Sequence, residues 1–100
     1  MEEVLARLAA ANIDFLTALE LTTHFVVTRD GFVALIERRE GGFGNIGAPG
    51  LLCERGVAQL IWRGEQAFFI ARGFAEPATP EQIEALRRFG RDVKNSLASQ

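Results

Sequence analysis

The chain has 100 residues, of which 48% are hydrophobic and 24% charged, a composition typical of a folded globular domain rather than of a disordered segment. Its net charge of −2 and its pI near 5.4 provide no overall attraction to nucleic acid or to an anionic membrane. The single cysteine, Cys53, excludes an internal disulfide framework and leaves too little sulfur for a structural zinc site, so we expect one domain over residues 1–100 without cofactor or metal.

The beginning of the chain predicts a cytoplasmic protein. Met1 is followed by Glu2 and Glu3 instead of the basic residues and apolar core of a secretory signal. No uninterrupted apolar run in the sequence approaches the ~20 residues that are needed to cross a bilayer. We therefore expect a cytoplasmic location and partners that include neither a membrane nor nucleic acid.

Residues 2–20 predict an amphipathic helix. Apolar side chains recur at spacings of three and four residues, and Glu2 and Glu3 lie at the end where the helix dipole is positive. Asn12 leaves an alternative open, because asparagine adopts the left-handed conformation that ends helices. In that alternative a short helix is followed by a strand within Ile13 to Leu21. We favour the long helix.

The next segment, His24 to Arg38, predicts a β-hairpin. Asp30 and Gly31 give the strongest two-residue turn signal in the chain, since a type I′ turn requires positive φ at both positions. Pairing across this turn places His24 opposite Glu37. The remaining pairs make both faces of the hairpin largely apolar: Val26 with Leu35, Thr28 with Val33, Phe25 with Ile36, and Val27 with Ala34.

Glu40 to Gly50 contains five glycines and predicts a loop. Within it, Gly42 to Gly47 matches the G-x-G-x-x-G pattern of nucleotide-binding loops, but the following Pro49 prevents the helix that such a site needs. We therefore interpret this segment as a flexible linker. A mobile flap over a pocket, with Phe43 and Ile46 as its apolar tips, is the alternative.

The longest apolar stretch, Gly56 to Gly73, predicts a second hairpin. Gly64 and Glu65 suit its turn, because glycine at the first central position accepts a positive φ without steric cost. Pairing gives an apolar set on each face: Trp62 with Ala67 and Leu60 with Phe69 on one, and Ile61 with Phe68 and Gln59 with Ile70 on the other. Such a hairpin has to be covered on both faces, by helices, by a second copy or by a ligand.

Residues 80–97 predict the last helix. Thr79 is a favourable N-cap, Pro80 suits the first helical position, and Gln82 occupies the capping-box position. Gly90 costs about 1 kcal/mol relative to alanine inside a helix, which indicates close packing at that point. Cations are grouped late in this helix, an order that stabilises the helix and does not require nucleic acid: Arg87, Arg88, Arg91 and Lys94.

A candidate ligand-binding set consists of His24, Glu37, Phe43 and Cys53. The first two are neighbours in the predicted hairpin, and Cys53 is the only thiol. Catalysis or metal binding by this set is disfavoured, because a single cross-strand pair is usually structural and no spacing supplies three zinc ligands. Four arginines at predicted strand ends would bind a small anionic ligand if they gathered on one rim: Arg38, Arg39, Arg63 and Arg72.

These elements predict an α+β fold with an antiparallel meander sheet of four or five strands, including a short one in Leu51 to Glu54, and N- and C-terminal helices packed on one face. The other face is left uncovered, which predicts association through the sheet. We expect a non-catalytic cytoplasmic interaction or sensor domain that forms a homodimer, or binds a protein partner, through Leu60, Trp62 and Phe69 or through a strand edge. The alternative is a small-molecule-binding protein or small enzyme with a pocket under Gly41 to Gly50.

Overall fold

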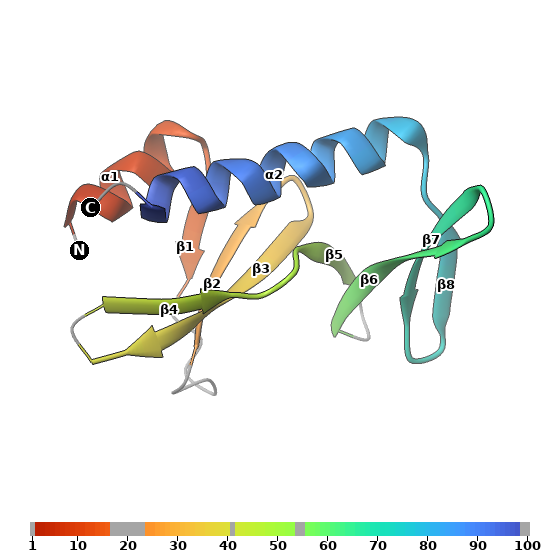
Figure 1. The fold of residues 1–100 in the computed structure, drawn as a ribbon, viewed down its shortest axis with the longest axis horizontal. Helices are drawn as coiled ribbons and strands as arrows, with labels where there is room; N and C mark the ends of the chain where they lie inside the picture. The colour runs from red at the N-terminus through yellow and green to blue at the C-terminus, as the bar shows by residue number, and fades with distance from the viewer. Residues whose placement is uncertain (1, 17–23, 41, 54–55, 99–100) are drawn as a thin grey trace.

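The computed structural model describes residues 2–16, 24–40, 42–53 and 56–98 (Figure 1). Two helices and eight strands lie within these ranges. In chain order their bounds are α1 Glu2–Ala10, β1 Asp14–Leu16, β2 His24–Arg29, β3 Phe32–Arg39, β4 Gly42–Ile46, β5 Gly50–Cys53, β6 Gly56–Arg63, β7 Gln66–Ala71, β8 Phe74–Pro77 and α2 Pro80–Ala98.

The strands form one curled antiparallel sheet in the order β1-β2-β3-β5-β6-β7-β8, and β4 pairs with β3. Strand β3 pairs with β2 along one edge and with two strands along the other. Its C-terminal half pairs with β4, where Ile36 lies opposite Ile46. Its first residues pair with β5, where Phe32 lies opposite Leu51. The predicted class, α+β with an antiparallel sheet, is confirmed, but the described part of the sheet has eight strands instead of four or five.

The segment predicted as a glycine-rich linker contains strand β4, in which Gly42 pairs with Arg39. The loop prediction was therefore wrong over Gly42–Ile46. The hydrogen bonds of a sheet join backbone groups, and glycine provides these groups as other residues do. At Gly44 a Cβ would collide with the ends of the Glu37 and Arg39 side chains, so a larger residue there requires these two side chains to move.

The first helix ends two residues before Asn12, so the long helix favoured for residues 2–20 is wrong and the short-helix alternative is right over the described part. Asn12 has a φ of 61°, the left-handed conformation that ends helices. The Ile13 N–H then donates to the Leu8 carbonyl at 2.8 Å, and β1 begins one residue later. The part of this prediction on residues 17–21 lies outside the described residues.

Both predicted hairpins are confirmed, with the predicted pairing. Asp30 and Gly31 have φ values of 53° and 86°, as a type I′ turn requires, and His24 lies opposite Glu37. In the second hairpin Gly64 has a φ of 65°. The pairs there are Leu60 with Phe69, Trp62 with Ala67, Ile61 with Phe68, and Gln59 with Ile70. Turn chemistry therefore sets the register of both hairpins.

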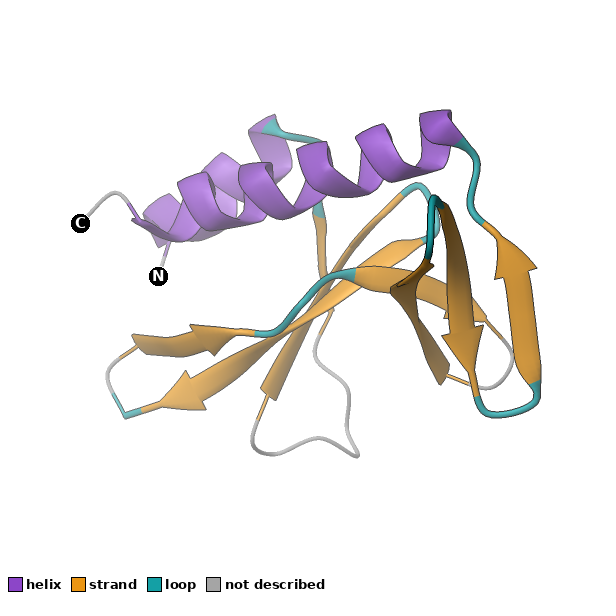
Figure 2. Ribbon diagram, turned by 45° about the vertical axis from the view of Figure 1, so that its right-hand side comes forward, coloured by secondary structure: helices purple, strands orange, loops and turns teal. Residues whose placement is uncertain are grey.

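Both helices lie over the same side of the curled sheet, which we call the inner face (Figures 1 and 2). The opposite side is the outer face. The ring of Phe32 on β3 lies 6.4 Å from the ring of Phe89 on α2 and 6.3 Å from that of Phe69 on β7. The core thus spans the helices and the inner face, and its largest fully buried side chains are Phe69, Phe89, Leu8, Ile36, Val27 and Val93.

Helix α2 begins at the predicted capping box. The Gln82 N–H donates to Thr79 Oγ1 at 3.1 Å, and the Thr79 N–H donates to Gln82 Oε1 at 2.9 Å. A Cβ added at Gly90 would lie 3.1 Å from Pro49 Cγ, which confirms the predicted close packing at this glycine. Neither of the described helices is long and apolar enough to span a membrane.

Arg29 connects both helices to the sheet. Its Nη1 donates to the Ala11 carbonyl at 2.8 Å and to Asp92 Oδ2 at 2.9 Å. Its Cζ lies 5.7 Å from the centre of the Phe89 ring. Because the Arg29 side chain is only 16% exposed, its pair with Asp92 is largely shielded from water, and removal of one partner leaves a poorly solvated charge.

Asn12 provides a test of the helix end. Asn12→Gly should leave the free energy of unfolding within about 0.5 kcal/mol of the parent, whereas Asn12→Val should lower it by about 1–2 kcal/mol, because a β-branched side chain is strained at positive φ. Urea denaturation measures both values. A valine variant as stable as the parent would contradict the left-handed conformation.

Arg29 provides a test of the contact between the helices and the sheet. Arg29→Met should lower the free energy of unfolding by about 2–3 kcal/mol, because the Asp92 carboxylate and the Ala11 carbonyl lose their donor. Arg91→Met, at an exposed position of α2, is the matched control and should change it by less than about 0.5 kcal/mol. Equal stability of the two variants in urea would show that Arg29 does not hold these elements together.

Candidate functional site

The three residues predicted to form a contact surface lie on the inner face, which the helices cover. Phe69 is fully buried in the core, Leu60 packs partly buried against it, and Trp62 is 50% exposed beside the start of α2. Phe69 is therefore not available to a partner in this structure. The predicted pairing of these residues is correct, but pairing does not reveal which face the helices occupy.

Besides Trp62, exposed apolar side chains lie on the outer face of β5, β6 and β7. Ile61 and its cross-strand partner Phe68 alternate with inner-face residues along their strands, and Leu52 pairs with Val57 on the same outer face. Leu52 is 56% exposed and Ile61 43%, and the other members are partly buried. We call this set the outer patch: Leu52, Val57, Ile61, Phe68 and Ile70.

Strands β6, β7 and β8, which carry most of the outer patch, form one end of an elongated molecule (Figure 2). The principal extents are 41 × 26 × 19 Å, and the radius of gyration is 13.9 Å, against about 13 Å for a compact chain of this length. The accessible surface is 6694 Å², whereas a monomer of 11.0 kDa is expected to expose about 5,600 Å². The chain therefore presents more surface than a compact monomer of its mass.

A shallow apolar hollow of about 170 Å³ continues the outer patch at Val57. It borders the segment Gly41 to Gly50. The alternative function, a small-molecule-binding protein or small enzyme, predicts a pocket under this segment. None of the predicted ligand residues lines it; its lining includes Val33, Leu35, Gly47, Ala48, Val57 and Gln59.

The structure separates the predicted ligand residues. His24 and Glu37 lie side by side on the outer face, in the predicted pairing. Phe43 lies on the inner face, where its ring centroid is 5.4 Å from that of Phe25 in an edge-on contact. Cys53 is partly buried against the core from β5. The four residues therefore do not form one site.

Glu37 is held in an ion pair at the surface. The Nε–H of Arg39 donates to Glu37 Oε1, and the hydrogen bond and charge of Arg39 lower the pKa of the Glu37 carboxyl below its ordinary value. A backbone hydrogen bond from Asn45 and the charge of His24 act in the same direction. A carboxylate with a lowered pKa is a weaker proton acceptor, which does not favour Glu37 as a catalytic base.

The four strand-end arginines do not gather on one rim. The Cζ of Arg38 lies 4.3 Å from the centre of the Phe25 ring on the inner face, whereas Arg39 lies on the outer face. Arg63 and Arg72 lie at opposite ends of the β6–β7 hairpin. The expected anion site is thus not assembled from these residues. In the described parts of the chain, no group of three His, Cys, Asp or Glu side chains is placed to hold a metal ion.

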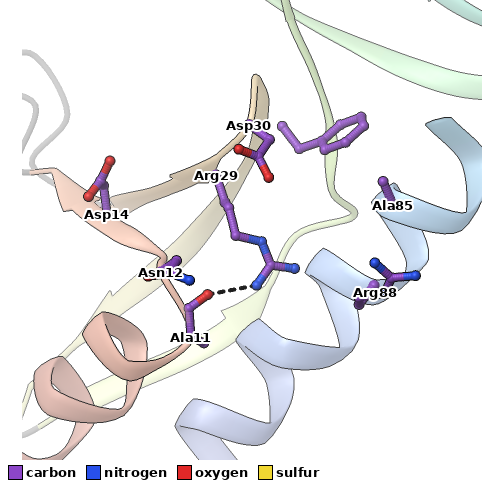
Figure 3. Close-up of a pocket in the computed structure, with 8 residues that line it drawn as sticks. Ala11, Asn12, Asp14, Arg29, Asp30, Ala85 and Arg88 are labelled. Atoms are coloured by element: carbon purple, nitrogen blue, oxygen red, sulfur yellow. Dashed lines mark hydrogen bonds between the residues drawn. The ribbon is translucent and has the colours of Figure 1, made fainter. Parts of the chain in front are cut away.

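A polar cleft of about 510 Å³ lies between the turn after α1, the β2–β3 turn and α2 (Figure 3). Its walls include Asp14, Arg29, Asp30, Phe32, Ala85 and Arg88. The sequence contains one signal of this cleft. Arg29 follows Phe25 and Val27 at alternate positions of β2, so its side chain is directed inward, where a charged group needs partners.

No protein-family model, no curated protein and no solved structure matches this chain. The apolar outer patch and the polar cleft are the features of the described surface that indicate a function.

The ion pair of Glu37 makes a pH-dependent prediction. NMR titration should give Glu37 a pKa below the ordinary value of a glutamate, and Arg39→Gln should raise it toward that value. Because the pKa is lowered by folding, the stabilisation is present at neutral pH and is lost as the pH falls through the pKa of the folded state. Arg38→Gln, on the opposite face, is the control and should leave the Glu37 pKa unchanged. An ordinary Glu37 pKa in the parent would contradict the ion pair.

Proposed function

We propose that this chain is a non-catalytic cytoplasmic interaction domain that works as a homodimer through the outer patch. The observation that carries the proposal is the exposure of Leu52 and Ile61, at 56% and 43%, on the sheet face opposite to both helices. Burial of such side chains is favourable by about 25 cal/mol per Å² of apolar surface removed from water. A second sheet is the natural cover for a sheet face, because two such faces pack about 10 Å apart with interdigitated side chains.

A second copy of the chain fits this face because the patch is uncharged. Gln59, the polar residue within it, is neutral, and Arg63 lies at its end, where its charge stays in water. A two-fold contact brings the same patch together from both subunits, so a charge inside the patch would be buried in both copies and, near the two-fold axis, would face its own copy. The outer patch has no such charge, and its self-association is free of this repulsion.

The outer patch lies at one end of an elongated molecule, where a second copy can approach without contacting the helices. The apolar hollow beside Val57 offers space for a side chain of the partner at the edge of the patch. These features support a face-to-face dimer over a contact by strand edges alone.

The alternative function, a small-molecule-binding protein or small enzyme with a pocket under Gly41 to Gly50, has less support. His24 and Glu37 lie on the outer face, whereas Phe43 and Cys53 belong to the inner side of the sheet. The polar groups that such a pocket would use are therefore divided by the sheet itself.

Charge substitution in the outer patch tests the dimer. Light scattering on the parent should give twice 11.0 kDa, and Ile61→Glu should give a folded monomer, because the dimer would bury two carboxylates without partners. Leu5→Glu is the matched control, since Leu5 is 36% exposed on α1, away from the sheet, and this variant should stay dimeric. Trp62→Glu distinguishes the two faces and should also stay dimeric.

Two results would contradict the proposal. One is a parent that is monomeric at about 100 μM, a concentration at which an interface with a micromolar Kd is formed. The other is an Ile61→Glu variant that keeps the mass of the parent with an unchanged circular dichroism spectrum. If Trp62→Glu alone loses the dimer, the contact between subunits lies on the inner face around Trp62, as the sequence predicted.

A further inference from the structure

We infer that the polar cleft binds the head group of a small α-amino acid, a ligand with a carboxylate and an ammonium on one carbon. The inference begins with Arg29, whose position is fixed by Ala11, Asp92 and Phe89. A guanidinium held in this way has little rotamer freedom left to lose when it binds a ligand. Arg29 is therefore a pre-organised donor at the wall of the cleft.

Two nitrogens of the Arg29 guanidinium make no hydrogen bond within the described part of the chain. Both hydrogen bonds of its side chain are made by Nη1, which leaves the N–H groups of Nε and Nη2. No side-chain polar atom that is fully buried lacks a partner among the described residues, so these two nitrogens are not completely enclosed, and Arg29 is one of the residues that line the cleft. The edge formed by Nε and Nη2 is the edge of a guanidinium that binds a carboxylate through two parallel hydrogen bonds.

A second cation and two carboxylates complete the charge pattern. Figure 3 shows Arg88 on α2, across the cleft from Arg29, and Asp30 in the turn above Arg29. Asp14 lies at the far rim from β1. The Arg88 side chain is 55% exposed and its distance to Glu84 is 3.9 Å, a weak surface pair that leaves it free to turn toward a ligand.

This pattern favours a zwitterion over a simple anion or a simple amine. A lone carboxylate would bind Arg29 but would be repelled by Asp14 and Asp30 at the rim. It would also be repelled by Asp92, the ion-pair partner of Arg29, whereas a lone amine would be repelled by the two guanidinium groups. An α-amino acid satisfies both signs within one small molecule. Its side chain then lies toward the apolar part of the wall, which Phe32 and Ala85 supply.

Isothermal titration calorimetry at neutral pH with L-leucine tests the inference. Leucine should bind one per chain, whereas 4-methylpentanoate, which lacks the amine, and 3-methylbutylamine, which lacks the carboxylate, should bind at least about tenfold more weakly. Arg88→Gln and Asp30→Asn should each weaken leucine binding by about tenfold or more. Asparagine keeps the turn at residue 30, because it tolerates the φ of 53° found there. Arg91→Gln is the control and should bind leucine as the parent does.

Three results would overturn the inference. These are no leucine binding up to about 10 mM, equal binding of leucine and 4-methylpentanoate, and unchanged leucine affinity in both cleft variants. Thermal melts of each variant show whether it is folded, so that a loss of binding is interpreted only for folded protein. The cleft does not overlap the outer patch, and the calorimetric result is therefore independent of whether the chain is a dimer.

Discussion

The structure depends on one constraint: its sheet is apolar on both faces, and both of its helices lie on the same one (Figures 1 and 2). The strands make both faces apolar, because adjacent residues point to opposite faces and Leu60 and Ile61 are both large apolar side chains. When the helices bury Phe69 and its neighbours, Ile61 is left toward water. The proposed dimer is the physical consequence of this unequal cover.

The inner face is held by a second interaction, the polar contact of Arg29 with Ala11 and Asp92. A charged side chain at an inward position of β2 requires partners, and the end of α1 and the last turns of α2 supply them. The same contact connects both helices to the sheet through Nη1 and leaves Nε and Nη2 without a hydrogen bond in the described part of the chain. The polar cleft is therefore a direct result of the way in which the helices are attached to the sheet.

Local chemistry made part of this fold predictable. Asp30 and Gly64 set the turns and thus the registers, and the cap at Thr79 set the start of α2, because each effect involves only a few neighbouring residues. The end of α1 at Asn12 was only an alternative, since the same apolar spacing suits a helix or a strand. Strand β4 was missed although its partner β3 directly precedes it, because the glycines of this segment are typical of loops and weaken the strand signal.

The sequence alone does not show which face of the sheet the helices cover. Trp62 and Ile61 are adjacent, large and apolar, and the face that each takes relative to α2 is decided by long-range packing. An NMR experiment on a mixture of isotope-labelled and unlabelled chains, which records only contacts between molecules, measures the result directly. Contacts between the methyl groups of Leu52 or Ile61 and the Phe68 ring of another molecule are expected. The absence of contacts between molecules, or contacts confined to α2, would contradict the uncovered outer face as the site of association.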